Sequence, residues 1–374
     1  MKVVYLILNS LEFDSRARLE IDVIGSMGHD VEIICTVGAE PDNYNGHPIH
    51  RIKQYTWPTR KIRFAQFNLY AGKIGARLKG DIYHAVDLDV LLGAYRAARK
   101  TGGKLIYEAR ELYTELEPLQ GRNTLKAIWR GLERRLIGKA DRVITINESI
   151  AGELRKRYGI DKPAIIRNMA MPVADVKPVD LRKKFNVPDN FRIILYQGVL
   201  RSGQGLLYQL EIMKYLDKVA MLFLGAGPIE DHIRKKSVEY GMEDRVILAG
   251  RVSPDELLNY TASADAGLLL MEDTAMNNRL ALPQKLFQYL AAGIPQIVSP
   301  LPEISRFVKN EDTGIVIPLG QPREAAEGIA KFLNDSSRYN EVRENCRKSA
   351  KKNNWENESR KLIEIYRELG TRND

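Results

Sequence analysis

The sequence predicts an α/β fold made of two Rossmann-like, doubly wound domains that face each other across a cleft. The chain has 374 residues, which is too many for one compact core. Short runs rich in Val and Ile alternate with longer segments of helical period, as in parallel sheets covered by helices on both faces. This alternation is interrupted once, near the middle of the chain, and then starts again.

In the first half, amphipathic segments separate apolar runs of strand length. We expect a first helix over 16–27 that Gly28 ends, and a later helix over 90–100 that Asp89 caps and Gly102 ends. The expected strands are 3–8, 31–36, 82–85, 104–107 and 142–146.

The second half repeats this order after a segment, 168–188, that contains Pro172, Pro178 and Pro188 and is expected to be the hinge. We predict an N-terminal domain over 1–172, a C-terminal domain over 173–350, and a final segment, 351–374, whose helix crosses back to the first domain. Ligands are expected at the carboxyl ends of the strands. The expected strands are 192–196, 220–224, 246–248, 266–270 and 296–299.

Composition narrows the classes of function. No apolar run is long enough to span a bilayer, the N-terminus lacks the features of a signal peptide, and Cys35 and Cys346 suggest no disulfide framework, so we expect a cytoplasmic protein. The net charge of +9 favours anionic partners. No nucleic-acid-binding motif is present, and we expect no nucleic acid partner.

The segment 282–285 is typical of a helix start, with Pro283 at the first helical position. The amides of Gln284, Lys285 and Leu286 would then be free to bind a diphosphate, with help from the Lys285 ammonium group. Gln288, one turn later, would suit ribose hydroxyls. The alternative is an ordinary capped helix that packs its leucines into the core.

Two glycine-rich loops follow expected strands of the second half. Gly225 and Gly227 suit either close approach to a nucleotide or a tight strand-to-helix turn. In the loop from Gly198 to Gly205, Arg201 is the only cation and a possible phosphate contact.

Over nearly its whole length, the chain resembles the retaining glycosyltransferases of the GT-B fold, group 1 (family 4). The most specific stretch is 277–295, followed by 301–304. Seven supporting segments occur in the family's order, together with a closing helix that begins at Trp355. They are 14–16, 81–87, 111–115, 140–145, 165–168, 196–198 and 225–228.

The resemblance implies transfer of a sugar from a nucleotide diphosphate donor to a carbohydrate or lipid-linked acceptor, without a metal or other cofactor. The implied residues around the reacting sugar are His84, Arg110 and Glu111, and those on the acceptor side are Asp14 and Arg16. The implied donor-binding residues are Gly198, Arg201, Gln204, Gly225, Gly227, Asn278, Pro283, Gln284, Lys285 and Gln288.

Several positions depart from the family pattern. Gln204 stands where a cation is usual, Gln288 and Leu280 where glutamates are usual, and Val86 and Arg110 where histidines are common. These departures leave open an active enzyme with a rearranged site, or a non-catalytic subunit or scaffold. A sugar-nucleotide epimerase or phosphorylase of the same fold is a further alternative.

Two other features bear on partners. Asp87-Leu88-Asp89 resembles a metal-binding Asp-x-Asp, but Asp89 is explained as a helix cap, so we expect no metal. The segment Trp57–Lys79 interleaves cations with aromatic residues, which suits an anionic membrane surface and suggests peripheral attachment to the inner membrane face. An aromatic helix face packed on the first sheet is an equally good interpretation.

Overall fold

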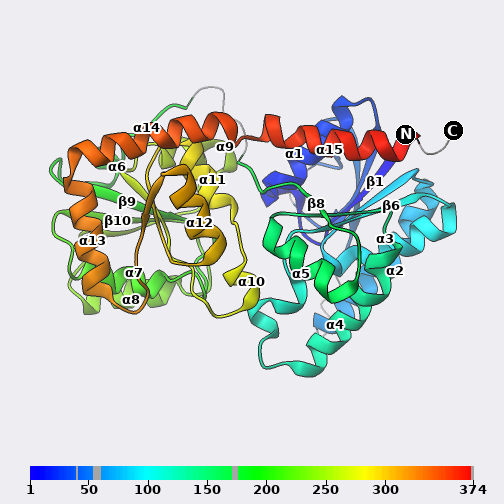
Figure 1. The fold of residues 1–374 in the computed structure, drawn as a ribbon, viewed down its shortest axis with the longest axis horizontal. Helices are drawn as coiled ribbons and strands as arrows, with labels where there is room; N and C mark the ends of the chain where they lie inside the picture. Colours follow the sequence, from blue (N-terminus) through cyan, green and yellow to red (C-terminus); the bar gives the residue numbers. More distant parts are fainter. Residues whose placement is uncertain (39–40, 54–59, 171–175, 372–374) are drawn as a thin grey trace. The chain divides into compact units, whose positions relative to one another are not determined.

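In the computed structural model, contacts divide the chain into two compact units, each built on one mainly parallel sheet (Figure 1). Unit 1 comprises Met1–Asn168 and Trp355–Asp374, and unit 2 comprises Met169–Asn354. The structure describes residues 1–38, 41–53, 60–170 and 176–371. The domain limit predicted at 172/173, and Trp57 of the basic aromatic segment, lie outside these residues.

The sheet of unit 1 has the strand order β3-β4-β2-β1-β5-β6-β7-β8, and every pair is parallel except β3 with β4. The chain builds one side of the sheet outward from β1 and then returns to β5, so the strand order reverses between β1 and β5. The strands are β1 (Lys2–Leu6), β2 (Asp30–Thr36), β3 (Asn43–Tyr44), β4 (His47–Ile52), β5 (Ile82–Val86), β6 (Lys104–Ala109), β7 (Arg142–Thr145) and β8 (Ala164–Ile165).

The helices of unit 1 follow local capping rules. Asp14 accepts a hydrogen bond from the Ala17 amide at 2.8 Å and starts α1. The predicted cap of α3 is wrong, because the helix begins directly after Asp87 and Asp89 lies in its first turn. The helices are α1 (Ser15–Ser26), α2 (Arg60–Leu78), α3 (Leu88–Thr101), α4 (Asn123–Leu136), α5 (Glu148–Tyr158) and α15 (Trp355–Gly370).

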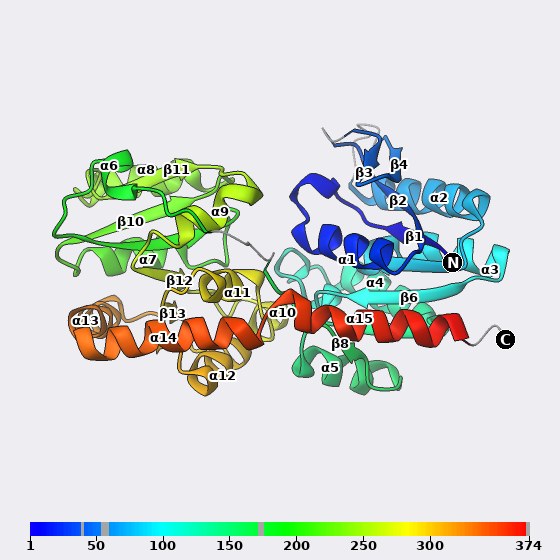
Figure 2. The same cartoon turned by 90° about the horizontal axis from the view of Figure 1, so that it is seen from above.

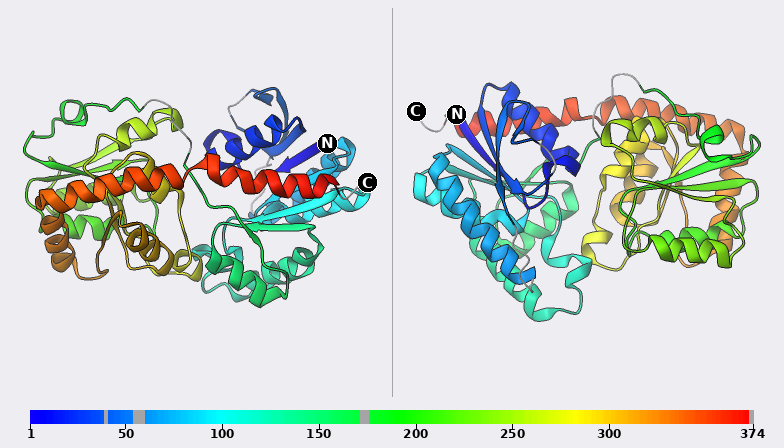
Figure 3. Two further views of the ribbon diagram at one scale, coloured as in Figure 1. Left: turned by 45° about the horizontal axis from the view of Figure 1, so that its top comes forward. Right: turned by 180° about the vertical axis from the view of Figure 1, so that it is seen from behind.

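The last helix, α15, belongs to unit 1 by its contacts and lies along it in Figures 2 and 3. It buries Trp355, Leu362 and Tyr366. Near its start, buried Glu358 accepts the Arg167 amide at 2.8 Å and pairs with the Arg167 guanidinium at 3.0 Å. Apolar burial and this ion pair together hold the C-terminal helix on the first unit.

The sheet of unit 2 is fully parallel in the order β11-β10-β9-β12-β13-β14, so its strand order reverses between β9 and β12. Its strands are β9 (Arg192–Gln197), β10 (Val219–Leu224), β11 (Val246–Gly250), β12 (Ala266–Leu269), β13 (Gln296–Val298) and β14 (Gly314–Val316). Its helices are α6 (Leu181–Phe185), α7 (Leu206–Met213), α8 (Glu230–Glu239), α9 (Pro254–Thr261), α10 (Met276–Arg279), α11 (Gln284–Ala291), α12 (Pro302–Glu311), α13 (Pro322–Asn334) and α14 (Ser336–Lys352).

The predicted fold class is confirmed, and all ten expected strands form within one or two residues of their predicted limits. The strands that the pattern missed lie at or near sheet edges. β4 contains Pro48 and two histidines, and on its outer side it pairs only with the two-residue β3. Such a strand needs no apolar alternation, because much of it remains accessible to solvent.

Candidate functional site

The carboxyl edge of the unit 2 sheet brings polar side chains together where the strand order reverses. β9 ends at Gln197, with Gly198 directly after it, and β12 on its other side leads through α10 into α11. In open parallel sheets, ligands bind outside the carboxyl ends of the strands at such a switch point. The residues around Gly198 and the start of α11 therefore form the candidate site of unit 2.

Lys285, in the first turn of α11, directs its ammonium group toward the end of β9. Its Nζ atom donates to the hydroxyl of Tyr196 at 2.8 Å and to Oε1 of Gln204 at 2.7 Å. Nζ also lies 4.4 Å from the centre of the Tyr196 ring, which is a cation–π distance. Both oxygens are uncharged, and Lys285 forms no salt bridge within the described part of the chain.

The surroundings of Lys285 disfavour its charged form. Burial, and then the nearby charge of exposed Arg201, lower the pKa of Lys285 to about 7. An ammonium group in this position gains from any anion that comes close, because no carboxylate among the described residues neutralises it.

Glycines allow the loops after β9 and β10 to pack around this lysine. A Cβ atom on Gly198 would lie 2.6 Å from Cε of Lys285, and one on Gly225 would lie 1.9 Å from the carbonyl oxygen of Gly198. A Cβ atom on Gly227 would lie 2.3 Å from the carbonyl oxygen of Leu200. Protein packing therefore explains Gly225 and Gly227, in agreement with the tight-turn interpretation of the sequence.

A row of polar side chains connects α9 to α11 through the end of β9. The hydroxyl of buried Thr261 lies 2.7 Å from Oε1 of Gln197, and Nε2 of Gln197 donates to Oε1 of Gln288 at 2.6 Å. Gln288 is the partly exposed end of the row. Its side chain is therefore held in place by buried neighbours, as a ligand-binding amide requires.

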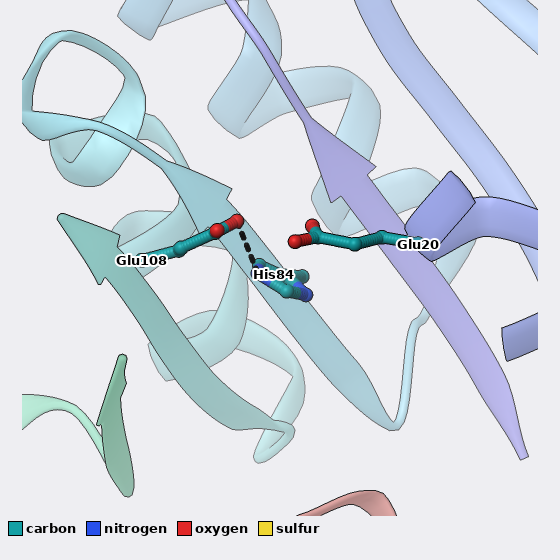
Figure 4. A group of neighbouring side chains, drawn as sticks. All are labelled: Glu20, His84 and Glu108. Carbon is teal, nitrogen blue, oxygen red and sulfur yellow. Dashed lines mark ion pairs between the residues drawn. The ribbon is translucent and has the colours of Figure 1, made fainter. Parts of the chain in front are cut away.

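Unit 1 contains a buried ionic network at its own switch point, between β1 and β5. Figure 4 shows Glu20 of α1, His84 of β5 and Glu108 of β6 pointing toward one another. Arg16 lies 2.5 Å from Glu108 and 2.9 Å from Glu20, both measured between nitrogen and oxygen. Arg110 lies 3.2 Å from each of the same two carboxylates.

The two arginines determine whether this cluster is a metal site or an ion-pair network. Glu20, His84 and Glu108 each offer a ligand atom, and these atoms lie within 4.8 Å of one another, which is a spacing suited to a metal ion. Burial alone would raise the pKa of Glu108, but the guanidinium groups of Arg110 and Arg16 hold it well below its usual range. A metal ion would have to displace these cations, so the group is better described as an ion-pair network.

The network changes the roles expected for three residues. His84 is fully buried, with Nδ1 2.9 Å from the hydroxyl of Tyr366 and Nε2 3.3 Å from Glu108. Arg16 is also buried, and Arg110 is nearly so. Their polar groups are directed at protein partners. This geometry does not support contact of His84 or Arg110 with the reacting sugar, or of Arg16 with an acceptor.

Further carboxylates gather at the ends of β5 and β6. Burial, and then the charge of Glu111, raise the pKa of Asp89 to about 7 and that of Asp87 well above its usual range. Asp87 accepts the Arg110 amide at 2.9 Å, and its φ of 65° is rare for a residue other than glycine. Of the predicted catalytic residues, Glu111 is thus the one that lies beside these carboxyl groups at the carboxyl edge of the sheet.

Asp14, predicted on the acceptor side, caps α1 and pairs with Arg110 at 3.0 Å.

Comparison with known proteins now identifies the family. The family described as "Glycosyltransferase Family 4" matches residues 23–169, and "Glycosyl transferases group 1" matches residues 179–353. The chain belongs to the group 1, family 4 glycosyltransferases. An uncharacterised glycosyltransferase of Methanocaldococcus jannaschii is 24% identical over 370 residues, which cover 91% of this chain and 90% of that protein.

Solved structures share the fold of this glycosyltransferase. Sucrose-phosphate synthase from Thermosynechococcus elongatus aligns with a TM-score of 0.83 at 16% identity over 99% of both chains. The Anabaena protein HepE, solved in complex with UDP-glucose, aligns with a TM-score of 0.77 at 15% identity, covering 98% of this chain and 100% of that chain. The predicted GT-B fold is thereby confirmed.

The structure explains two of the residues by which this glycosyltransferase departs from its family's pattern. Gln204, at a position usually held by a cation, turns its side-chain oxygen toward Lys285. Because lysine can only donate hydrogen bonds, the geometry fixes this orientation of the amide. Gln288, at a position usually held by glutamate, accepts a hydrogen bond from Gln197, which itself accepts one from Thr261.

Other residues predicted to bind the donor form contacts within the protein at and near the start of α11. Pro283 is the residue before α11 and not its first residue, and the Leu286 amide bonds to the Pro283 carbonyl at 3.1 Å, so it is not a free donor. Buried Asn278 of α10 donates to the hydroxyl of Thr274 at 3.0 Å. The Gln284 side chain donates to the carbonyl of Met169 at 3.1 Å.

Sequence reasoning gave no role to Tyr196, Gln197 or Thr261, although they hold Lys285 and Gln288. One signal was available, because Gln197 ends an otherwise apolar strand and is followed by glycine. A buried glutamine at the carboxyl end of a parallel strand requires polar partners, which indicates a polar cluster at that edge.

Proposed function

We propose that this glycosyltransferase moves a sugar from a nucleotide diphosphate donor to an acceptor hydroxyl, with retention at the anomeric carbon, in polysaccharide or glycolipid assembly. The observation that carries the proposal is the ammonium group of Lys285, which lies at the start of α11 without a carboxylate partner among the described residues. Such a position favours an anion such as a diphosphate. The UDP-glucose bound by HepE is consistent with a donor of this kind.

In the proposed site, the Lys285 ammonium group and the backbone amides at the start of α11 face the diphosphate, with Arg201 as a second cation. Gln288 faces the ribose hydroxyls. Negative charge grows on the diphosphate as it leaves, and prepositioned donors can lower that barrier by about 3 kcal/mol each. These groups supply the positive charge that the reaction needs, so the proposal includes no metal and no side-chain nucleophile. Glu111 is the residue of unit 1 that we propose to lie at the reacting sugar.

Thermal-shift measurements with UDP, GDP and ADP, followed by calorimetry with the nucleotide that stabilises the protein, test this function. Lys285→Ala is expected to weaken binding about tenfold to a hundredfold, because charge-assisted contacts to phosphate are lost. Lys184→Ala is the matched control, since Lys184 lies 5.0 Å from the centre of the Tyr260 ring and donates to its hydroxyl. Equal affinities for the two variants would show that Lys285 does not bind the diphosphate.

The same screen separates the alternatives. A non-catalytic subunit, suggested by the uncharged Gln204 and Gln288, would show no stabilisation by any nucleotide at millimolar concentration. An epimerase would bind a nucleotide sugar and convert it without an acceptor. Product analysis with and without added acceptor sugars distinguishes this outcome from transfer.

We further propose peripheral binding to an anionic membrane at the inner face, through α2 and α4. Phe64 of α2 meets Trp129 of α4 with ring centres 5.2 Å apart, and Phe67 is buried, so these aromatic residues serve packing. Leu69 and Tyr70 of α2 and Ile128 of α4 are exposed. The two helices carry five and four cations respectively, against the single acidic residue Glu133. No helix in the described ranges combines the length and hydrophobicity that crossing a bilayer needs.

Co-sedimentation with liposomes tests this surface. Binding is expected to require anionic lipid and to weaken with salt, because it depends on these cations. Ile128→Glu should reduce it, whereas Val238→Glu in unit 2 is the control, since the two side chains are similarly exposed at 61% and 59%. Equal recovery in the supernatant with and without anionic lipid would exclude the membrane role.

A further inference from the structure

Lys285 differs from most buried or partly buried cations in the kind of group that holds it. The buried arginines at the switch point of unit 1, Arg16 and Arg110, are paired with carboxylates. Lys285 instead has two neutral oxygens, from Tyr196 and Gln204. A neutral oxygen holds the nitrogen in place but stabilises its positive charge much less than a carboxylate would.

The groups that face Lys285 come from the end of β9 and from the loop that follows it. Tyr196 at the end of β9 provides its hydroxyl and ring, and burial raises the pKa of that hydroxyl, so it stays neutral. The loop after β9 provides neutral Gln204 and the charged group of Arg201, which repels a second cation. Gly198 leaves the space that the lysine side chain occupies. Within the described residues, the charged group acting on Lys285 is therefore a cation.

We propose that Tyr196 and Gln204 are positioning residues that hold Lys285 through neutral oxygens alone, so that the bound diphosphate is its first anionic partner and its binding is coupled to the uptake of one proton by Lys285. This inference rests on the proposed donor site and adds a property to it. The lysine of the free protein is a mixture of amine and ammonium near neutral pH, because its pKa is about 7. In the complex it is ammonium, because the phosphate charge stabilises that form. The proton comes from the solvent.

The expected proton uptake follows from this linkage. At pH 8, about nine-tenths of a group with a pKa near 7 is neutral, so binding should take up about 0.9 proton per diphosphate. Over the same range the affinity should fall as pH rises, by about eightfold between pH 7.5 and pH 8.5. A diphosphate ester is almost fully ionised at these values of pH, so it contributes little to the change.

Isothermal titration calorimetry measures the uptake directly. The nucleoside diphosphate that stabilises the protein is titrated at pH 8 in buffers of different ionisation enthalpy, and the slope of the observed enthalpy gives the number of protons. Gln204→Glu places a carboxylate against Lys285 and should keep it protonated, so the uptake should fall close to zero and the pH profile should flatten. Ser202→Glu adds the same charge at an exposed position of the same loop and should leave the uptake unchanged.

A second measurement needs no ligand. Acylation of Lys285, followed by mass spectrometry across a pH series, gives the midpoint for its free amine. We expect a midpoint near pH 7 in the wild type and more than 2 pH units higher in Gln204→Glu. Tyr196→Phe keeps the ring and removes one neutral oxygen. It should weaken diphosphate binding about fivefold while the proton uptake persists.

The outcomes separate this inference from the proposed function. Diphosphate binding without proton uptake, or with equal uptake in wild type and Gln204→Glu, would overturn the inference and leave the donor site intact. A wild-type acylation midpoint above pH 9 would overturn it as well, even if no nucleotide binds. Absence of binding to UDP, GDP and ADP would instead count against the proposed function.

Discussion

The buried ionic network of unit 1 makes Glu108→Gln an informative substitution. Glu108 is fully buried and faces the guanidinium groups of Arg16 and Arg110 at 2.5 and 3.2 Å. The substitution keeps the shape of the side chain and removes its charge, which leaves Asp14 and Glu20 as the carboxylates that face the two arginines.

The expected cost follows from this geometry. Removing one member of a buried ion pair destabilises a protein by about 3–5 kcal/mol, because the charge of its partner stays buried. In a domain of this size that loss lowers the melting temperature by about 6–20 °C. The folded-state pKa of Glu108 lies below the unfolded value, so its contribution is complete at pH 7 and is lost as pH falls below 4.5 toward the folded-state pKa. The difference between wild type and variant should therefore shrink in acid.

Tryptophan fluorescence during urea unfolding is a selective assay, because Trp57, Trp129 and Trp355 all belong to unit 1. The control is Glu153→Gln, since Glu153 forms a partly exposed pair with Arg157 at 3.0 Å and should cost less than about 1 kcal/mol. If Glu108→Gln destabilises unit 1 no more than this control does, the network does not hold the unit together and our reasoning is wrong.

Three further predictions test other contacts. Tyr366→Phe leaves Nδ1 of buried His84 without its hydroxyl partner and should lower the free energy of unfolding of unit 1 by about 1–3 kcal/mol in the same assay. A change of less than about 0.5 kcal/mol would contradict a role of this bond in docking α15. Gly314→Ala places a Cβ atom 1.9 Å from the carbonyl oxygen of Gln296 and should destabilise unit 2 by about 1–3 kcal/mol, which circular dichroism would detect with the tryptophan signal unchanged. Gln288→Glu should tighten nucleotide binding about fivefold in calorimetry, because a charged acceptor forms stronger hydrogen bonds with ribose, and weaker binding would argue that this side chain does not face ribose.

The order of strands and helices was predictable from the sequence because it depends on local patterns. The run before Leu6 and the run before Gln197 are apolar throughout, as strands buried on both faces must be. Gly102 marks the end of α3 for an equally local reason, because its φ of 79° suits a residue without a side chain.

Part of the site was predictable on the same basis. Lys285 was found because it lies in the first turn of a recognisable helix, and the glycine of the loop after β9 because it directly follows a strand. Each of these assignments depends on residues only a few positions apart.

The partners of these residues could be known only from the tertiary structure. Lys285 meets Tyr196, which lies 89 positions away, and His84 meets Tyr366, which lies 282 positions away. The electrostatic environment of a side chain depends on the charges that lie within a few ångströms of it, and these charges can belong to residues far away in the sequence. His84 and Arg110, expected at the reacting sugar, were therefore found in a buried ion-pair network, whereas Lys285 lies among neutral oxygens at the switch point of unit 2.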